Sequence, residues 1–99
     1  MLTLPIKKQW FDMIRSGVKT EEYRERTGHY YKRFRNIGFL NLSAPEYKAK
    51  IRFRNGYYRG APELIASCTL SIGQGRPEWG AQEGKEYYVL HIKEVLQDV

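Results

Sequence analysis

Three charged residues within six positions, Lys19, Glu22 and Arg24, have the types and spacing that fit binding or catalytic chemistry. Two cations held together can bind a phosphate group or a base carbonyl, while the carboxylate orients them or accepts from a base edge. The lysine and the carboxylate could instead act as an acid/base pair. A solvated charged turn without any ligand is the competing interpretation, because such residues are mostly exposed in proteins.

A short helix and the strand after it would position these side chains. Apolar residues recur at helical spacing in the segment before them: Ile6, Trp10, Met13 and Ile14. This spacing predicts a helix over Ile6–Arg15, with Pro5 at its first turn, that ends at Gly17 in a left-handed cap. The strand is predicted over Val18–Glu25. Strict alternation would place Lys19 and Glu22 on opposite faces, so a shared site requires that Lys19 still belongs to the turn.

The pattern G-x-K-x-x-E-x-R is spelled by four residues of this turn and strand: Gly17, Lys19, Glu22 and Arg24. It resembles the signature of the ASCH domain family. The preceding segments Leu4-Pro5-Ile6 and Trp10–Ile14 are similar to the first strand and helix of that family. The resemblance therefore covers Leu2–Arg24, about a quarter of the chain.

The ASCH resemblance implies a small β-barrel related to PUA domains, and binding of RNA or of modified nucleosides. Some members are hydrolases, among them an amidohydrolase acting on N4-acetylcytidine, and others are reported as ribonucleases. Lys19 matches the lysine of the family. Glu22 stands where the amidohydrolase branch has a threonine, and Leu64–Ile72 lacks the second carboxylate that this branch carries on a downstream strand. Both departures speak against the amidohydrolase activity.

The first functional hypothesis is therefore an RNA- or nucleotide-binding module. A carboxylate beside Lys19 favours the charged lysine, which suits a fixed cation better than a general base. The predicted ligand-binding residues are Gly17, Lys19, Glu22, Arg24, Arg52, Arg54 and Trp79. The second hypothesis is a hydrolase acting on RNA or a modified nucleoside, with Lys19 and Glu22 as catalytic residues. The third is a protein-interaction domain whose basic surface meets an acidic partner.

Composition agrees with a small basic domain. The chain has 99 residues, enough for one domain over residues 1–99. Its hydrophobic content of 41% excludes a disordered chain. The net charge of +6 favours polyanionic partners, nucleic acid first.

The sequence offers little for metal or cofactor chemistry. Cys68 is the single cysteine, and His29 and His91 are isolated, so neither a disulfide nor a zinc site is expected, and no cofactor is predicted. Cys68 is interpreted as a small buried apolar residue. The N-terminus lacks the pattern of a signal peptide, and no apolar run is long enough for a membrane span. We therefore expect a cytoplasmic protein without membrane contact; nothing in the sequence indicates its oligomeric state.

The clearest strand in the sequence is Tyr47–Arg54, where apolar and basic residues alternate. One face carries Tyr47, Ala49, Ile51 and Phe53, and the other carries four cations, the basic face: Lys48, Lys50, Arg52 and Arg54. This period of two predicts a half-buried strand. The basic face either binds a polyanion beside Lys19 and Arg24 or protects an edge strand against aggregation.

The remaining elements complete a strand-dominated α+β domain of about six strands with one or two short helices, which agrees with a PUA-like barrel. A short helix is predicted over His29–Arg35, and strands over Met1–Leu4, Phe39–Ser43, Leu64–Ile72 and Tyr87–Leu96. Asn55-Gly56 predicts a hairpin turn, with Tyr57-Tyr58 starting the return strand. In the long loop Gly73–Gly84, Trp79 either plugs the end of the barrel or stacks on a base; burial as a plug is favoured.

Overall fold

The computed structural model describes residues 1–40, 43–44 and 46–98. Its main feature is a single curled sheet whose described residues form five strands in the order β1-β3-β4-β5-β2. The first pair, β1 and β3, is parallel, and the other pairs are antiparallel. The strands are β1 (Leu2–Pro5), β2 (Glu21–Arg24), β3 (Ala49–Arg54), β4 (Glu63–Gln74) and β5 (Glu86–Asp98).

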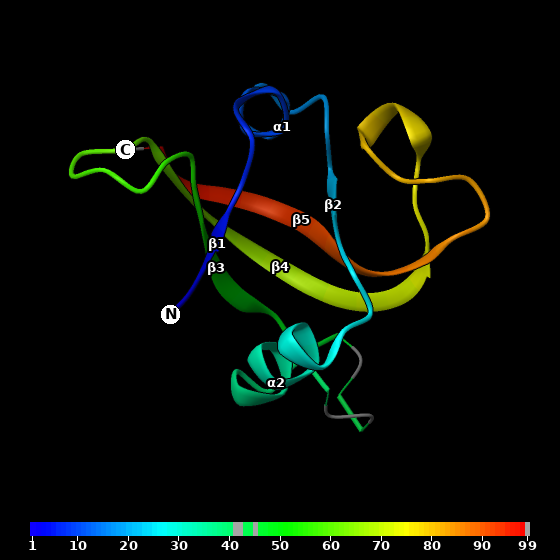
Figure 1. The fold of residues 1–99 in the computed structure, drawn as a ribbon. Helices are drawn as coiled ribbons and strands as arrows, with labels where there is room; N and C mark the ends of the chain where they lie inside the picture. Colours follow the sequence, from blue (N-terminus) through cyan, green and yellow to red (C-terminus); the bar gives the residue numbers. More distant parts are fainter. Residues whose placement is uncertain (41–42, 45, 99) are drawn as a thin grey trace.

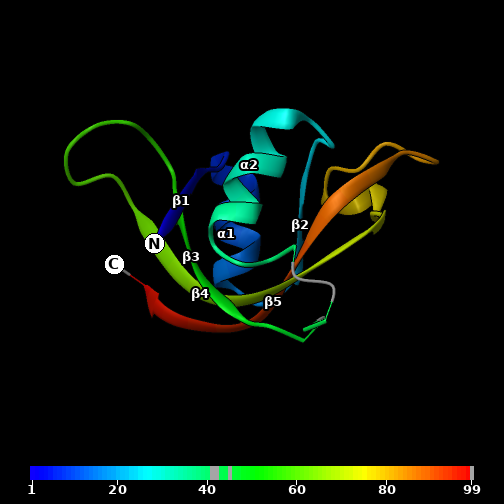
Figure 2. The same cartoon turned by 90° about the horizontal axis from the view of Figure 1, so that it is seen from below.

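The sheet bends into a half-barrel, and its two helices lie on the concave side (Figures 1 and 2). The helices are α1 (Lys8–Arg15) and α2 (Gly28–Asn36). The long strands β4 and β5 make most of the curve, and their pairing is interrupted by register shifts at Ile65/Ala66 and Ser67/Cys68. Such shifts increase local bend and twist, which helps two long strands to wrap around the helices.

The core fills the trough between sheet and helices. Each helix contributes a fully buried aromatic ring, Phe11 from α1 and Phe34 from α2. Ile51 and Phe53 of β3 face them and are also fully buried, as the alternation in this strand predicted. None of the helices formed by the described residues is long and apolar enough to cross a membrane.

Helix α1 begins later than predicted, because Pro5 ends β1 instead of starting the helix. The predicted end is confirmed: Gly17 has a φ of +84°, a conformation that glycine adopts readily. The chain then folds back, and the Lys19 N–H donates to the carbonyl of Met13 at 3.0 Å. Since β2 begins only at Glu21, Lys19 lies in the turn, as a shared site required.

Helix α2 agrees with its prediction within one residue at each end. The hydroxyl of Thr27 caps its N-terminus by accepting from the Tyr30 N–H at 3.4 Å. Phe34 points into the core, while Lys32, Arg33 and Arg35 are exposed. The helix therefore presents its basic residues to solvent.

Two sequence predictions after α2 differ from the structure. Where a strand was predicted over Phe39–Ser43, Phe39, Leu40 and Ser43 lie in turns, and Asn41 and Leu42 are outside the described residues. The sixth strand is therefore not found in the described part of this segment.

The prediction of a tight hairpin turn at Asn55-Gly56 is also wrong. A two-residue type I′ turn needs a positive φ at both central residues, and only Gly56 has one, at +121°. The chain instead makes a loop over residues 55–62, closed by a hydrogen bond of 3.0 Å from the Asn55 N–H to the Pro62 carbonyl. Tyr57-Tyr58 lie in this loop and do not start the return strand, which begins at Glu63.

Candidate functional site

Lys19 is buried although it carries an ionisable group. The residue is 1% exposed. Its Nζ donates to the carbonyl of Trp79 at 2.7 Å and lies 3.1 Å from Oε1 of Glu22. The turn after Gly17 aims the side chain inward, toward a carbonyl that lies 60 positions further along the chain.

Glu22 joins Lys19 to Arg24. Its second oxygen, Oε2, accepts a hydrogen bond of 2.7 Å from Nη2 of Arg24. Glu22 and Arg24 are only 6% and 9% exposed. The structure thus brings together three of the predicted site residues, here called the buried ion cluster: Lys19, Glu22 and Arg24.

Arg24 extends this cluster toward β1 and α2. Its Nη2 also donates to the carbonyl of Pro5 at 2.7 Å, and its Nη1 donates to the hydroxyl of Tyr30 at 3.3 Å. Glu22 and Arg24 share one face of β2 because they are two positions apart on a strand. Gly17, the fourth residue of the motif, acts through its positive φ, which allows the turn before Lys19.

Aromatic rings flank the buried ion cluster. The Nζ of Lys19 lies 4.9 Å from the ring centroid of Trp10 and equally far from that of Tyr23, within the range of cation–π attraction. A surface hollow of about 200 Å³ opens beside them and is called the Glu22 hollow here. Its lining consists of Lys7, Trp10, Glu22, Tyr23, Arg24, Trp79 and Gly80.

Burial and Glu22 act on the pKa of Lys19 in opposite directions. Burial lowers the pKa of Lys19 below its usual value. The charge of Glu22 acts in the opposite direction, as expected, and Arg24 acts in the same direction as burial. Removal from water therefore outweighs the single carboxylate, and Lys19 loses its proton more easily than an ordinary lysine.

Trp79 lies on the short 3-10 helix η1 (Pro77–Trp79) inside the loop predicted over Gly73–Gly84. The residue is 9% exposed, which agrees with the favoured interpretation as a plug. Its carbonyl binds Lys19, and its indole lies 4.7 Å from the guanidinium carbon of Arg76. Trp79 therefore forms one wall of the Glu22 hollow.

The predicted ligands Arg52 and Arg54 are engaged elsewhere. Nη1 of Arg54 donates to Oε2 of Glu63 at 2.6 Å, and Nε of Arg52 lies 3.6 Å from Oε1 of the same carboxylate. Strand β3 lies between β1 and β4, so the interpretation of its basic face as edge protection is wrong. Arg52 and Arg54 are not brought to the buried ion cluster, and half of the basic face is paired with Glu63.

Sequence reasoning missed a polar cluster on the other face of the sheet, because no motif or spacing indicated it. Ser71 Oγ lies 2.7 Å from His91 Nε2, and His91 Nδ1 lies 3.6 Å from Glu21 Oε2. The order resembles a Ser-His-Glu triad, but a 3.6 Å separation is too long for a hydrogen bond. Ser71 also lies within the β4–β5 ladder, opposite Val89. This cluster is a cross-strand contact between β4, β5 and β2.

Cys68 is fully buried in the core, as predicted, and burial raises the pKa of its thiol to about 12. Within the part of the chain that the structure describes, no group of three or more His, Cys, Asp or Glu side chains is placed to hold a metal ion.

Comparisons of the chain with family models, with curated proteins and with solved structures find no match. The resemblance to ASCH domains therefore stays a prediction that rests on the motif residues of α1, the turn and β2.

Proposed function

We propose that this chain is an RNA- or nucleotide-binding module of the ASCH type, with a PUA-like half-barrel, and that its ligand enters the Glu22 hollow. The observation that supports this most is the buried ion cluster beneath a surface hollow with aromatic walls. A buried Lys-Glu-Arg network stabilises a fold less than apolar packing of the same volume would. Its position beside a surface hollow therefore favours a role in recognition.

Each group around the hollow has a counterpart in a nucleotide. Trp10 and Tyr23 offer aromatic rings against which a base can stack. Glu22 accepts hydrogen bonds from an exocyclic amine, and Arg24 holds Glu22 in place. Lys7 is exposed at the rim and supplies a cation for a phosphate, while Lys19, which is buried, acts as the fixed positive charge beneath the site.

A hydrolase acting on RNA or a modified nucleoside is the second candidate, and one observation favours it. Lys19 has a lowered pKa and lies within hydrogen-bonding distance of Glu22. Perturbed pKa values cluster at active sites, and a lysine that loses its proton readily can act as a general base. Binding is preferred because the Nζ of Lys19 is enclosed by Trp79, Glu22 and two rings.

Titration of nucleoside monophosphates and single-stranded oligonucleotides tests binding directly. Lys7→Gln removes the exposed cation at the rim and should weaken binding about threefold to tenfold, the effect of one typical hydrogen bond. Lys8→Gln is the matched control, since Lys8 is the next residue and pairs with Asp12 on the exposed side of α1. Equal affinities for Lys7→Gln and Lys8→Gln would place the ligand outside the Glu22 hollow. A wild-type protein that binds no nucleic acid would leave an acidic protein partner as the remaining hypothesis.

Glu22→Gln separates binding from catalysis. If Glu22 orients the ligand contacts, the change should weaken binding by about 1–2 kcal/mol. If Glu22 is a general acid or base, affinity should persist while turnover falls about 100-fold or more. Wild-type hydrolysis of RNA or of an acylated nucleoside, abolished in Glu22→Gln with affinity intact, would establish the enzyme in place of the binding module.

A further inference from the structure

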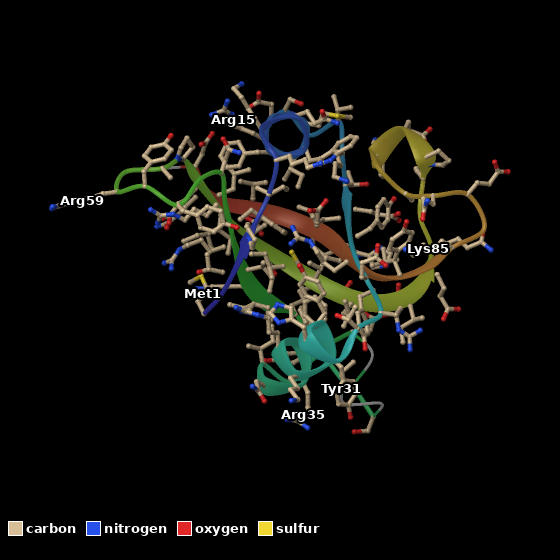
Figure 3. All side chains as sticks on the ribbon, viewed as in Figure 1. Met1, Arg15, Tyr31, Arg35, Arg59 and Lys85 are labelled. Atoms are coloured by element: carbon tan, nitrogen blue, oxygen red, sulfur yellow. The ribbon has the colours of Figure 1, made fainter. Side chains whose placement is uncertain are left out.

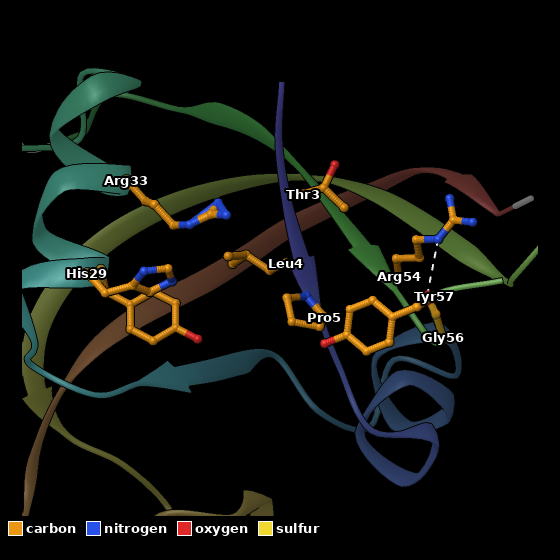
Figure 4. A pocket seen from close by; sticks show the side chains of 9 residues that line it. Thr3, Leu4, Pro5, His29, Arg33, Arg54, Gly56 and Tyr57 are labelled. Atoms are coloured by element: carbon orange, nitrogen blue, oxygen red, sulfur yellow. Dashed lines mark hydrogen bonds between the residues drawn. The ribbon is translucent and has the colours of Figure 1, made fainter. Parts of the chain in front are cut away.

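A second recess lies on the other side of Arg24 from the Glu22 hollow and is called the α2 pocket here. It has a volume of about 300 Å³. Strand β1 crosses it, with α2 on one side and the start of the 55–62 loop on the other (Figure 4). The lining consists of Thr3, Leu4, Pro5, His29, Tyr30, Arg33, Arg54, Gly56 and Tyr57.

The charges of the α2 pocket suit an anion. Arg33 projects from α2 toward the pocket (Figure 4), and no carboxylate of the described residues pairs with it. His29 lies beside it on the same helix. None of the lining residues carries a carboxylate. A phosphate that reaches this pocket therefore meets an available guanidinium and no opposing charge.

Arg54 has a different role in the pocket, because each of its three side-chain nitrogens already donates a hydrogen bond. Its Nε donates to the carbonyl of Gly56 at 3.1 Å, and its Nη2 donates to the carbonyl of Tyr58 at 2.6 Å. The remaining Nη1 donates to Glu63. Arg54 thus fixes the start of the loop against β3 and holds Tyr57 at the rim.

Tyr57 is the aromatic counterpart of Arg33 across the pocket. Its side chain stands on the loop side of β1 (Figure 4), and the residue is 89% exposed. Burial in the core does not account for so exposed a ring. A tyrosine between two carbonyls that Arg54 binds, beside a cationic pocket, is well placed to stack on a base.

Arg24 links the α2 pocket to the Glu22 hollow. Its guanidinium donates to the Pro5 carbonyl and to the Tyr30 hydroxyl, and both residues line the α2 pocket. Arg24 itself lines the Glu22 hollow. Pro5 in one lining and Lys7 in the other are two positions apart, so their Cα atoms are at most about 7 Å apart. The two recesses are therefore neighbours on the surface.

From this arrangement we infer that the α2 pocket is a second nucleotide subsite, and that the ligand is a single-stranded nucleic acid of two or more nucleotides. The inference rests on the proposed function, since it extends the same ligand beyond the Glu22 hollow. One nucleotide occupies the Glu22 hollow, and the chain continues past Pro5. Its phosphate meets Arg33, and the next base stacks on Tyr57. Single strands fit because their bases expose the faces that stacking requires.

The test compares short and long ligands on two pairs of variants. Arg33→Gln and Tyr57→Leu alter the α2 pocket. Arg35→Gln and Tyr31→Leu are their controls, since Arg35 and Tyr31 point away from the sheet on the outer side of α2 (Figure 3). Circular dichroism verifies that each variant is folded. The probes are nucleoside monophosphates and single-stranded RNA and DNA oligonucleotides of about eight nucleotides, a length within the usual range of such sites.

Arg33→Gln and Tyr57→Leu should each weaken oligonucleotide binding about fivefold to tenfold. They should leave the affinity for monophosphates as it is in the wild type, and both control variants should bind like the wild type. If the wild type binds the oligonucleotides but neither pocket variant differs from its control, the second subsite is refuted and the proposed function stands. An equal loss for monophosphates and oligonucleotides would also refute it, because the α2 pocket would then be the primary site. If the wild type binds neither ligand, the proposed function fails and the subsite with it.

Discussion

At the scale of single residues, Glu22 is the one negative charge between two buried cations. Lys19 and Arg24 each lie within about 3 Å of its carboxylate oxygens. A carboxylate in this position compensates charges that the fold has removed from water. The motif therefore has a structural role as well as the proposed binding role, and the two roles predict different measurements.

Glu22→Gln should lower the free energy of unfolding by about 3–5 kcal/mol, because it leaves two buried cations without their common partner. Denaturant unfolding at neutral pH measures this. Glu86→Gln is the control, since Glu86 pairs with Arg26 on the exposed surface and such pairs contribute about 1 kcal/mol or less. A cost for Glu22→Gln no larger than that for Glu86→Gln would contradict the compensating role.

The buried thiol of Cys68 leads to a prediction about the stability of the fold at alkaline pH. Its thiol pKa is raised from 9.0 to about 12 in the folded protein, so between these values the unfolded chain loses a proton that the folded chain keeps. The folded state then binds one more proton at this thiol, so the contribution of Cys68 to stability falls as pH rises. At pH 10 the loss amounts to about 1.4 kcal/mol relative to pH 8.

Cys68→Ala should lack this component of the pH dependence. The free energy of unfolding, measured for wild type and variant at pH 8 and pH 10, should therefore decrease by about 1.4 kcal/mol less in the variant. Because each protein is compared at two pH values, the constant cost of the cavity that alanine leaves cancels from the difference. Parallel pH curves for the two proteins would contradict the burial of the thiol.

At the scale of elements, the sequence predicted those features that a local pattern determines. The alternation in β3 predicted that Ile51 and Phe53 are buried, and the position of Gly17 predicted the end of α1. The hairpin at Asn55-Gly56 failed because Arg54 binds the carbonyls of Gly56 and Tyr58 and thereby stabilises a wider loop. The turn propensity of Asn55-Gly56 takes no account of a contact made by Arg54, the last residue of the preceding strand.

The loop that carries η1 depends on a close contact with α1. Gly80 has a φ of +103°, and a Cβ atom at this position would lie 3.0 Å from the Trp10 ring. Gly80→Ala should therefore destabilise the fold by about 1–2 kcal/mol. It should also displace η1 from Trp10 and weaken ligand binding in the Glu22 hollow. Gly84→Ala is the control, because it has a φ of +77° but no atom within 4 Å of the added methyl group. If the two variants bind ligand equally, η1 does not shape the hollow.

At the scale of the whole molecule, strand pairing assembles a site that the sequence predicted only in part. The convergence of Lys19 and Glu22 was predicted from the motif, on the condition that Lys19 lies in the turn before β2; strand alternation alone would have separated the two side chains. The contact of Lys19 with the carbonyl of Trp79 could not be predicted. The loop that contains Trp79 is brought to Lys19 by the antiparallel pairing of β4 with β5 and of β5 with β2. Likewise, the parallel pairing of β1 with β3 is what places Pro5 beside Arg54. Neither pairing leaves a local pattern in the sequence.

The ion pairs of Arg52 and Arg54 with Glu63 change the prediction of how nucleic-acid binding depends on salt concentration. Each phosphate of a single strand that a cation of the protein neutralises contributes about −0.7 to the slope of log affinity against log salt concentration. If all four cations of the basic face bound phosphates, the slope would be about −2.8. Arg52 and Arg54 are paired with Glu63, however, and the exposed cations at the two recesses are Lys7 and Arg33.

The wild-type slope for an oligonucleotide should therefore be about −1.4, one phosphate each for Lys7 and Arg33. Arg33→Gln should reduce its magnitude by about 0.7, because one phosphate contact is lost. Lys48→Gln should leave the slope as it is, since Lys48 lines a different hollow with Glu46 and Thr69. Fluorescence anisotropy titrations across a range of salt concentrations provide the slopes. A steeper slope that falls in Lys48→Gln but not in Arg33→Gln would move the nucleic acid from the two recesses to the basic face of β3.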